Sequence, residues 1–496
     1  MRKEFERVSP ESVGIPSGSI EKLIDKLEEG WTEPHGLMIM RDGKVCAEGW
    51  WTPYAPGIRH GLQSHTKTYA ATAVGIAYTE GLVDLEERVI DIFPDEAPKD
   101  PSENLKKLKV KHVLAMACGM KTMPMGGMEW IKDFLATPVE DEPGTSFMYN
   151  STGSSLLAAI VKKRSGQGMI EYLRTRLFDK IGIDTDNLKC ICMPDGIEMG
   201  GGGMYATTED NLRLMKLYAD GGVWEGERIL AEDYVKKATS LQNESATERA
   251  VNPPAEDNFV GYGYQIWMCR PEGVYRADGA MGQFTIVFPK YNMLLAITEC
   301  AMGATGGEMP QKALDTIWEW YYSLPAPDAK LAEDKAAADH LARRMKMLAL
   351  PSPDRSPVSP CQKDAEGKYV LTDGNLSFCG MGFFKPAAEG TLIKEVNLKF
   401  GSSDLFFDVV TKDGSKMNFT VALDGSYREN KVPDLVDQCL MYGKWTSDNT
   451  FVLTNRKIET CAADDYVLTF EGDKLTITQQ TRFFGLHENK VEFKRA

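Results

Sequence analysis

The stretch Gln63-Ser64-His65-Thr66-Lys67 opens an apolar run, Tyr69–Tyr78, that contains no charged side chain. A helix that is apolar on every side is buried, so this run predicts a core helix with Lys67 near its start. Residues three apart share one face of a helix, so the amine of Lys67 can reach the hydroxyl of Ser64. This pairing is typical of a serine nucleophile that works with a lysine and without a histidine.

The burial expected for Lys67 separates two interpretations of this stretch. A buried ammonium is costly unless it is paired or loses its proton, and a lysine with a lowered pKa is a usable general base. In the alternative, Ser64 only caps the helix and Lys67 extends to solvent, and these residues alone leave both open. Ser19 and Lys22 have the same spacing, but charges alternate with apolar residues over 20–29 and predict a surface helix capped by Ser19.

A second informative stretch, residues 143–153, reads Pro-Gly-Thr-Ser-Phe-Met-Tyr-Asn-Ser-Thr-Gly. It resembles the second signature of the serine β-lactamase and penicillin-binding protein superfamily, in particular the class C-like branch of esterases, D-amino-acid peptidases and related hydrolases. Segments 9–14, 110–119 and 201–210 resemble further landmarks of that family, in the same order. The resemblance covers residues 9–320 and implies an α+β fold, in which an antiparallel sheet flanked by helices joins a mostly helical lobe and a cleft between them holds Ser64.

The resemblance also implies roles for single residues. Ser64 matches the acylated nucleophile, Lys67 the amine that shares its proton, and Tyr149 the phenol of the second signature. A phenol near cations or bonded to a lysine can be held as a phenolate that takes the serine proton and later activates water. The other interpretation of Tyr149 is a core aromatic whose hydroxyl is bonded to the backbone.

Two positions depart from the family pattern. Ser151 stands where the family usually has an asparagine, and its hydroxyl lacks the simultaneous donor and acceptor of an amide. The third family signature, Lys-Thr-Gly or His-x-Gly, has its best match at Ala277-Asp278-Gly279, where the basic residue is lost and the glycine is kept. Both departures count against the recognition of β-lactams.

The lost basic residue bears on the substrate. Without it the binding of a substrate carboxylate is weaker, which favours esters or small acyl groups unless Arg276 turns in to replace the charge. The interpretation we favour for Arg276 is an exposed surface position. The backbone amides of Ser64 and Ala280 are the expected oxyanion-hole donors, because a main-chain donor does not depend on the missing side chain.

Composition narrows the class of protein. A chain of 496 residues is too long for one compact domain, and 43% hydrophobic with 26% charged residues is ordinary for a globular protein. The net charge of −15 argues against nucleic acid or an anionic membrane as partner. No run approaches the roughly 18 apolar residues of a membrane span. The charged start, residues 1–8, lacks an apolar signal core, so we expect a cytoplasmic protein or a mature exported form.

Other chemistries have little support. The chain has no His-Glu-x-x-His helix, no Walker loop and no Gly-x-Ser-x-Gly elbow, so we expect neither a metal nor a cofactor. Cys190 and Cys192 are predicted to be buried free thiols. The glycine run 200–203 lacks a lysine partner and predicts a turn. His65 points away from the helix face that carries Ser64. We expect it to lie in the core or to contact the side chains that hold the site in place.

The pattern of elements divides the chain into three parts. Residues 1–325 are expected to form the β-lactamase-like domain, with strands near both of its ends and a turn at Asp42-Gly43. Residues 326–361 combine a helix, roughly 328–348, with a proline-rich linker. Residues 362–496 alternate strands with turns such as Lys412-Asp413-Gly414-Ser415, and predict a β-barrel or β-sandwich appendage of unknown role.

Two functions of different classes follow. In the first, the chain is a serine hydrolase that forms an acyl-enzyme on Ser64 and acts on a small-molecule ester or amide, such as a small acyl ester or a D-amino-acid peptide. In the second, the altered Ser151 and Ala277 mark a degenerate, non-catalytic binding or scaffold protein. The sequence leaves a homo-oligomer open and does not say whether any β-lactam reacts.

Overall fold

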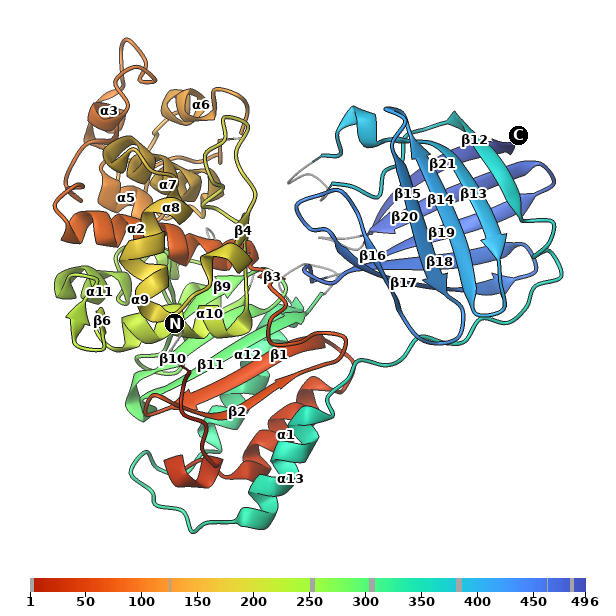
Figure 1. The fold of residues 1–496 in the computed structure, drawn as a ribbon. Coiled ribbons are helices and arrows are strands. Elements are labelled where there is room, and N and C mark those ends of the chain that lie inside the picture. Colours follow the sequence, from red (N-terminus) through yellow and green to blue (C-terminus); the bar gives the residue numbers. More distant parts are fainter. Residues whose placement is uncertain are drawn as a thin grey trace. The chain divides into compact units, whose positions relative to one another are not determined.

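The structure is a computed structural model, and it divides into two compact units, Met1–Leu348 and Ala349–Ala496. Figure 1 shows the elements of each unit along the chain. The residues that the structure describes are 4–124, 126–249, 255–302, 308–380, 386–461, 463–481 and 486–496.

The first unit contains a six-stranded sheet in the order β2-β1-β11-β10-β9-β8, antiparallel throughout. β1, from the start of the unit, and β11, from near its end, therefore pair in the middle of the sheet, as predicted. Asp42 and Gly43 connect β1 to β2 with φ of 53° and 74°, which confirms the two-residue turn. The strands are β1 Glu33–Arg41, β2 Lys44–Trp50, β8 Trp267–Met268, β9 Tyr275–Gly279, β10 Gln283–Phe288 and β11 Met293–Cys300.

Helices cover both faces of this sheet. Successive side chains of a strand point to opposite faces, and nearly all of β11 is buried. On one face, Phe288 of β10 packs against Trp318 and Tyr321 of α12, while on the other face Thr298 of β11 is hydrogen-bonded to Thr208 of α10. The helices beside the sheet are α1 Ser17–Leu27, α10 Thr208–Ala219, α12 Glu308–Tyr322 and α13 Lys335–Lys346.

The rest of the first unit is mostly helical and surrounds α2, Thr66–Thr79. Residues 66–77 of α2 are all buried, as its apolar composition predicts, and α2 packs along α7, Ser151–Ser165. Shorter helices are α3 Val89–Ile92, α4 Glu103–Lys107, α5 Val110–Leu114, α6 Trp130–Ala136, α8 Met169–Leu173, α9 Asp179–Ile181 and α11 Glu232–Ala238. Short strands are β3 His60–Gly61, β4 Lys189–Cys190, β5 Met204–Ala206, β6 Val223–Trp224 and β7 Glu227–Arg228.

Three local predictions need correction. Helix α1 begins at Ser17 after Pro16, so Ser19 is not its cap; the Ser19 hydroxyl donates to the carbonyl of Pro16 at 2.7 Å. Helix α13 is shorter than expected, because the side chain of Asp334 caps it at Lys335. Cys190 and Cys192 are free thiols, but Cys192 is exposed, since it follows β4 at the edge of a small sheet.

The second unit is a β-barrel. Its ten strands form one sheet in the order β15-β14-β13-β12-β21-β20-β19-β18-β17-β16, and a further pairing of β15 with β17 closes it. Gly414, with φ of 85°, lies in the predicted turn between β14 and β15. The strands are β12 Gly367–Asp373, β13 Ile393–Phe400, β14 Asp404–Thr411, β15 Lys416–Ala422, β16 Arg428–Lys431, β17 Gln438–Ser447, β18 Thr450–Lys457, β19 Ala463–Glu471, β20 Lys474–Thr481 and β21 His487–Arg495.

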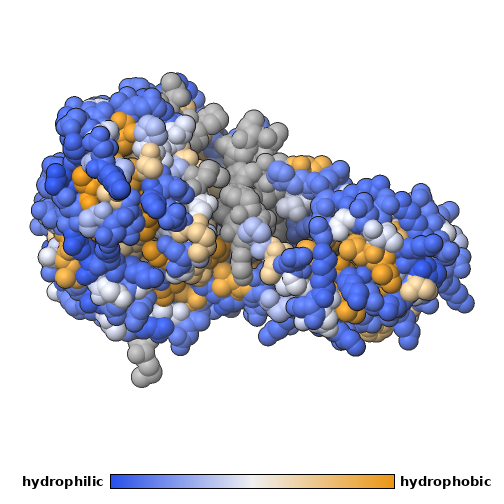
Figure 2. All heavy atoms as spheres, turned by 90° about the horizontal axis from the view of Figure 1, so that it is seen from above, coloured by the Kyte–Doolittle hydropathy of each residue, from blue (hydrophilic) through white to orange (hydrophobic). Residues whose placement is uncertain are grey.

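Figure 2 shows the surface of the molecule from one side. On the face drawn in Figure 2, hydrophilic residues predominate and hydrophobic residues gather in separate patches. Large exposed hydrophobic side chains come from separate elements, which is normal for a folded domain: Leu82, Met123, Met128, Tyr322, Met347, Val358, Phe406 and Leu486. Within the described part of the chain, none of the helices combines the length and the apolar character needed to cross a bilayer.

Candidate active site

Ser64 and Lys67 meet at the start of α2. A short 3-10 helix, Gln63–His65, leads into α2, and the amine Nζ of Lys67 lies 3.0 Å from the hydroxyl Oγ of Ser64. Ser64 is partly exposed, whereas Lys67 is 1% exposed. The interpretation in which Lys67 extends to solvent is therefore wrong. Ser64 thus lies at the edge of the core, and the amine approaches its hydroxyl from the buried side.

The amine of Lys67 has two further partners. Nζ donates to the hydroxyl of Ser151 at 3.1 Å and to the carbonyl of Gly201 at 2.5 Å. Burial lowers the pKa of Lys67 to about 7, against the opposing effect of the Asp278 charge. A neutral amine can donate to Ser151 and to Gly201 while its lone pair accepts the Ser64 proton. The surroundings of Lys67 therefore suit a proton acceptor near neutral pH.

The carbonyl of Gly201 was not identified from the sequence. The glycine run 200–203 was predicted to be a turn without a role. A Cβ at Gly201 would lie 2.3 Å from the carbonyl oxygen of Ser151, so glycine lets this loop approach the start of α7. The clustering of glycines was the available signal, because close backbone approach often requires them.

Ser151 takes the place beside the amine that the family pattern gives to an asparagine. It is the first residue of α7, and the preceding Asn150 is the N-cap, whose side chain accepts from the amide of Gly153 at 2.9 Å. Asn150 is buried and its amide nitrogen faces Met120 Sδ at 3.7 Å. The asparagine of this signature thus stabilises the helix start, and a hydroxyl contacts Lys67 instead.

Tyr149 also contacts the serine. Its phenol shares a hydrogen bond with Ser64, and its ring centroid lies 4.8 Å from Nζ of Lys67. Burial raises the pKa of Tyr149 strongly, the hydrogen bond to Ser64 lowers it, and the charge of Asp278 raises it further. The structure therefore argues against the phenolate expected from the sequence. A protonated phenol can orient Ser64 and pass on a proton, which leaves Lys67 as the better base.

The end of β9 lies beside the serine. A Cβ at Gly279 would lie 2.1 Å from the carbonyl oxygen of Leu62, two residues before Ser64, so this glycine is required for the close approach. Ala280, partly exposed, follows directly. The contact brings the backbone of Ala280 to the same end of the sheet as the backbone of Ser64. That these two amides form an oxyanion hole stays a prediction.

The prediction of an exposed Arg276 is wrong. Its side chain is fully buried on β9, where Nε donates to Asp278 Oδ2 at 2.7 Å and Nη2 to Asn258 Oδ1 at 2.8 Å. Nη1 donates to the carbonyl of Met268 at 3.2 Å. The guanidinium is therefore held by internal acceptors, and it does not turn toward a ligand.

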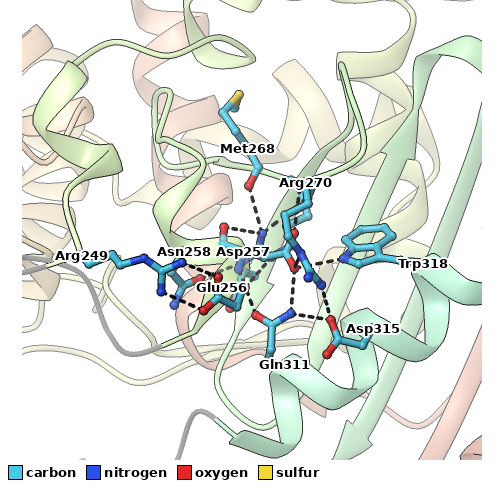
Figure 3. A network of polar contacts seen from close by, with 12 residues as sticks. Arg249, Glu256, Asp257, Asn258, Met268, Arg270, Gln311, Asp315 and Trp318 are labelled. Carbon is cyan, nitrogen blue, oxygen red and sulfur yellow. Dashed lines mark hydrogen bonds and ion pairs between the residues drawn. The ribbon is translucent and has the colours of Figure 1, made fainter.

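A buried carboxylate, Asp257, connects its own loop to Arg270, which follows β8, and to helix α12 (Figure 3). Its oxygens accept from the backbone amide of Arg270 at 2.8 Å, the Arg270 side chain at 2.9 Å, Gln311 at 2.8 Å and the indole of Trp318 at 3.0 Å. No motif in the sequence points to this network, because its members are distant in the chain. His65 also lies in the core, with its Nε2 3.0 Å from the hydroxyl of Thr285.

Comparison with known proteins adds an independent finding. A family model described as Beta-lactamase matches residues 20–304. The 6-aminohexanoate-dimer hydrolase of Paenarthrobacter ureafaciens is 27% identical over 232 residues, which are 43% of this chain and 58% of that protein. The D-aminopeptidase of Brucella anthropi is 22% identical over 184 residues, 34% of this chain and 35% of that protein.

The chain thus spans well under two thirds of the length of either relative. Among solved structures, a putative 6-aminohexanoate-dimer hydrolase from Bacillus anthracis has a TM-score of 0.50 and 17% identity, and the match covers 69% of this chain and 89% of that one. This likeness supports the fold.

Proposed function

Because the chain belongs to the Beta-lactamase family, we propose that it is a serine hydrolase in which Ser64 attacks an ester or amide carbonyl and forms an acyl-enzyme. The observation that carries the proposal is the buried amine of Lys67, 3.0 Å from the partly exposed hydroxyl of Ser64. Burial of a charged lysine costs stability, which a purely structural role does not repay. The same burial lowers the pKa of the amine, and a general base requires such a pKa.

The proposed reaction has two halves. The neutral amine of Lys67 takes the Ser64 proton while Oγ bonds to the carbonyl carbon, and the amides of Ser64 and Ala280 stabilise the oxyanion. The leaving group departs with a proton that Lys67 and the phenol of Tyr149 supply. Water then gives a proton to Lys67 and attacks the ester of the acyl-enzyme. As the bond between the acyl carbon and Oγ breaks, Lys67 returns the proton to Oγ, which releases the acid and restores the Ser64 hydroxyl.

The substrate class proposed is a small ester or amide. One relative is named 6-aminohexanoate-dimer hydrolase and the other D-aminopeptidase. These names support a small amide as the substrate. We assign this chemistry to residues 1–325 and regard 326–361 as the connection to the barrel of residues 362–496. Strand β9 offers no cation to the carboxylate of a β-lactam, because Asp278 occupies the third signature and Arg276 is held by internal acceptors.

Labelling with a fluorophosphonate tests the proposal, because such probes react with activated serines. We expect one label on the wild-type chain and none on Ser64→Ala, with the adduct found by mass spectrometry on the peptide that contains Ser64. Ser19→Ala is the matched control, since Ser19 and Lys22 repeat the same spacing outside the site, and it should label like the wild type. Equal background on all three proteins would favour the non-catalytic binding protein instead.

The activity should rise with pH through neutrality. Below a pKa of about 7 the amine of Lys67 is charged and cannot accept a proton, whereas above it the amine is neutral. We therefore expect kcat/KM for a neutral ester such as p-nitrophenyl acetate to reach half its plateau near pH 7. A profile that still rises near the ordinary lysine value of 10.5, or one that falls as pH increases, would contradict Lys67 as the base.

A further inference from the structure

Asp278 is a side chain of the candidate site whose role the proposed reaction leaves open. It precedes Gly279, whose contact with Leu62 keeps this end of β9 beside Ser64. The Asp278 charge acts on both Lys67 and Tyr149. Its side chain is 19% exposed, whereas that of its partner Arg276 is 1% exposed. The carboxylate therefore faces the reacting groups, and the guanidinium lies behind it.

Arg276 cannot reverse this arrangement. Its donors reach Asp278, Asn258 and the carbonyl of Met268, with weaker contacts to the carbonyl of Asp257 and the thiol of Cys269 at 3.5 Å. Withdrawing the guanidinium would leave buried acceptors without partners, at a cost that a surface ligand does not offset. A ligand at this end of β9 therefore meets an acceptor.

The charge of Asp278 is not fully compensated. Arg276 bonds to Oδ2, and no other donor within the described ranges of the chain is seen to reach this carboxylate. Arg276 is also attracted by Asp257, and Arg270 is shared between Asp257 and Asp315. Lys67 is a further cation that acts on Asp278, and its amine is neutral above its pKa of about 7. Asp278 therefore retains attraction for a further cation.

Aromatic rings beside Asp278 strengthen that attraction. The ring of Tyr149 stacks on Trp267 at 5.6 Å, and Tyr262 packs edge-on against Trp267 at 4.7 Å. Rings that exclude water raise the strength of a nearby charge interaction, and the face of Tyr149 already lies against one amine, that of Lys67.

We propose that Asp278 selects substrates that carry a cationic amine close to the scissile ester or amide, and disfavours substrates that carry a carboxylate there. This inference rests on the proposed hydrolase function of Ser64 and specifies its substrate class. The site then pairs a nucleophile with a fixed anionic contact on β9, at the position where the family pattern has a hydroxyl residue and next to Ala277, which replaces the basic residue.

Binding of simple amides tests the inference separately from catalysis. Calorimetry on the full chain carrying Ser64→Ala would compare glycinamide with propanamide, 4-aminobutanamide with pentanamide, and 6-aminohexanamide with heptanamide. Each pair differs only in an ammonium in place of a methyl group. We expect the amine to bind at least about tenfold more tightly in one pair or more, and the ratio to fall below about twofold after Asp278→Asn.

The matched control is Asp315→Asn, which removes a carboxylate from the same network on α12 and should keep the wild-type ratio. Asp278→Asn keeps an oxygen for Arg276, and Asp278→Thr, which restores the hydroxyl residue of the family pattern, is the second variant should the first not fold. Equal binding within every pair, or a preference that survives both Asp278 variants, would overturn the inference. Normal fluorophosphonate labelling with no amine preference refutes only this inference, whereas amine preference without labelling refutes only the hydrolase.

Discussion

Replacement of Lys67 by methionine is expected to lower kcat/KM for p-nitrophenyl acetate by about 10²–10⁴-fold, the usual contribution of a general base. Methionine fills the space of the lysine stem but cannot accept the Ser64 proton. Ser64 and its contact with Tyr149 stay in place. Initial rates at low substrate concentration measure the effect, and the rise of activity near pH 7 should disappear with it.

Stability distinguishes this loss from unfolding. An apolar replacement removes the burial penalty on the Lys67 charge but leaves the carbonyl of Gly201 without its donor, so the melting temperature should change little. Lys22→Met, in the second Ser-x-x-Lys sequence, is the control and should retain full activity. A Lys67→Met enzyme that is folded and still active within a few fold would refute the role of the amine.

Replacement of Arg276 by methionine is expected to lower the free energy of unfolding of the first unit by about 3–5 kcal/mol. Removing one partner of a buried ion pair leaves the other charge uncompensated, and here it also leaves Asn258 and the carbonyl of Met268 without their donor. Urea titration of the full chain, followed by tryptophan fluorescence, would show the shift, with the barrel transition as an internal reference.

Two further variants make the Arg276 result specific. Arg270→Met removes a guanidinium from the same network that is 41% exposed, so water can replace part of its contacts and the loss should be smaller. The double variant Arg276→Met with Asp278→Thr should recover part of the stability, because no unpaired carboxylate is left beneath the site. Equal losses for Arg270→Met and Arg276→Met, or no recovery in the double variant, would show that the buried pair is not what stabilises this strand.

The hairpin that begins the sheet and the contact between Ser64 and Lys67 followed from the sequence. Apolar residues on every side of 69–78 required a buried helix, and the three-residue spacing from Ser64 to Lys67 required both side chains to share its face. The Asp42-Gly43 turn likewise predicted the hairpin that begins the sheet. In each case neighbours in the chain are the interacting groups, so local geometry was sufficient.

Distant contacts decided the rest. Whether Arg276 is exposed depended on Asn258 and Met268, and whether Tyr149 is a phenolate depended on its burial and on Asp278. The residue that is hydrogen-bonded to Lys67 is Ser151, because the side chain of Asn150 caps α7. Strand and helix periodicity specifies which side chains share a face, but burial and hydrogen-bond partners are set by the elements packed on that face. Those elements are brought together only by the tertiary structure.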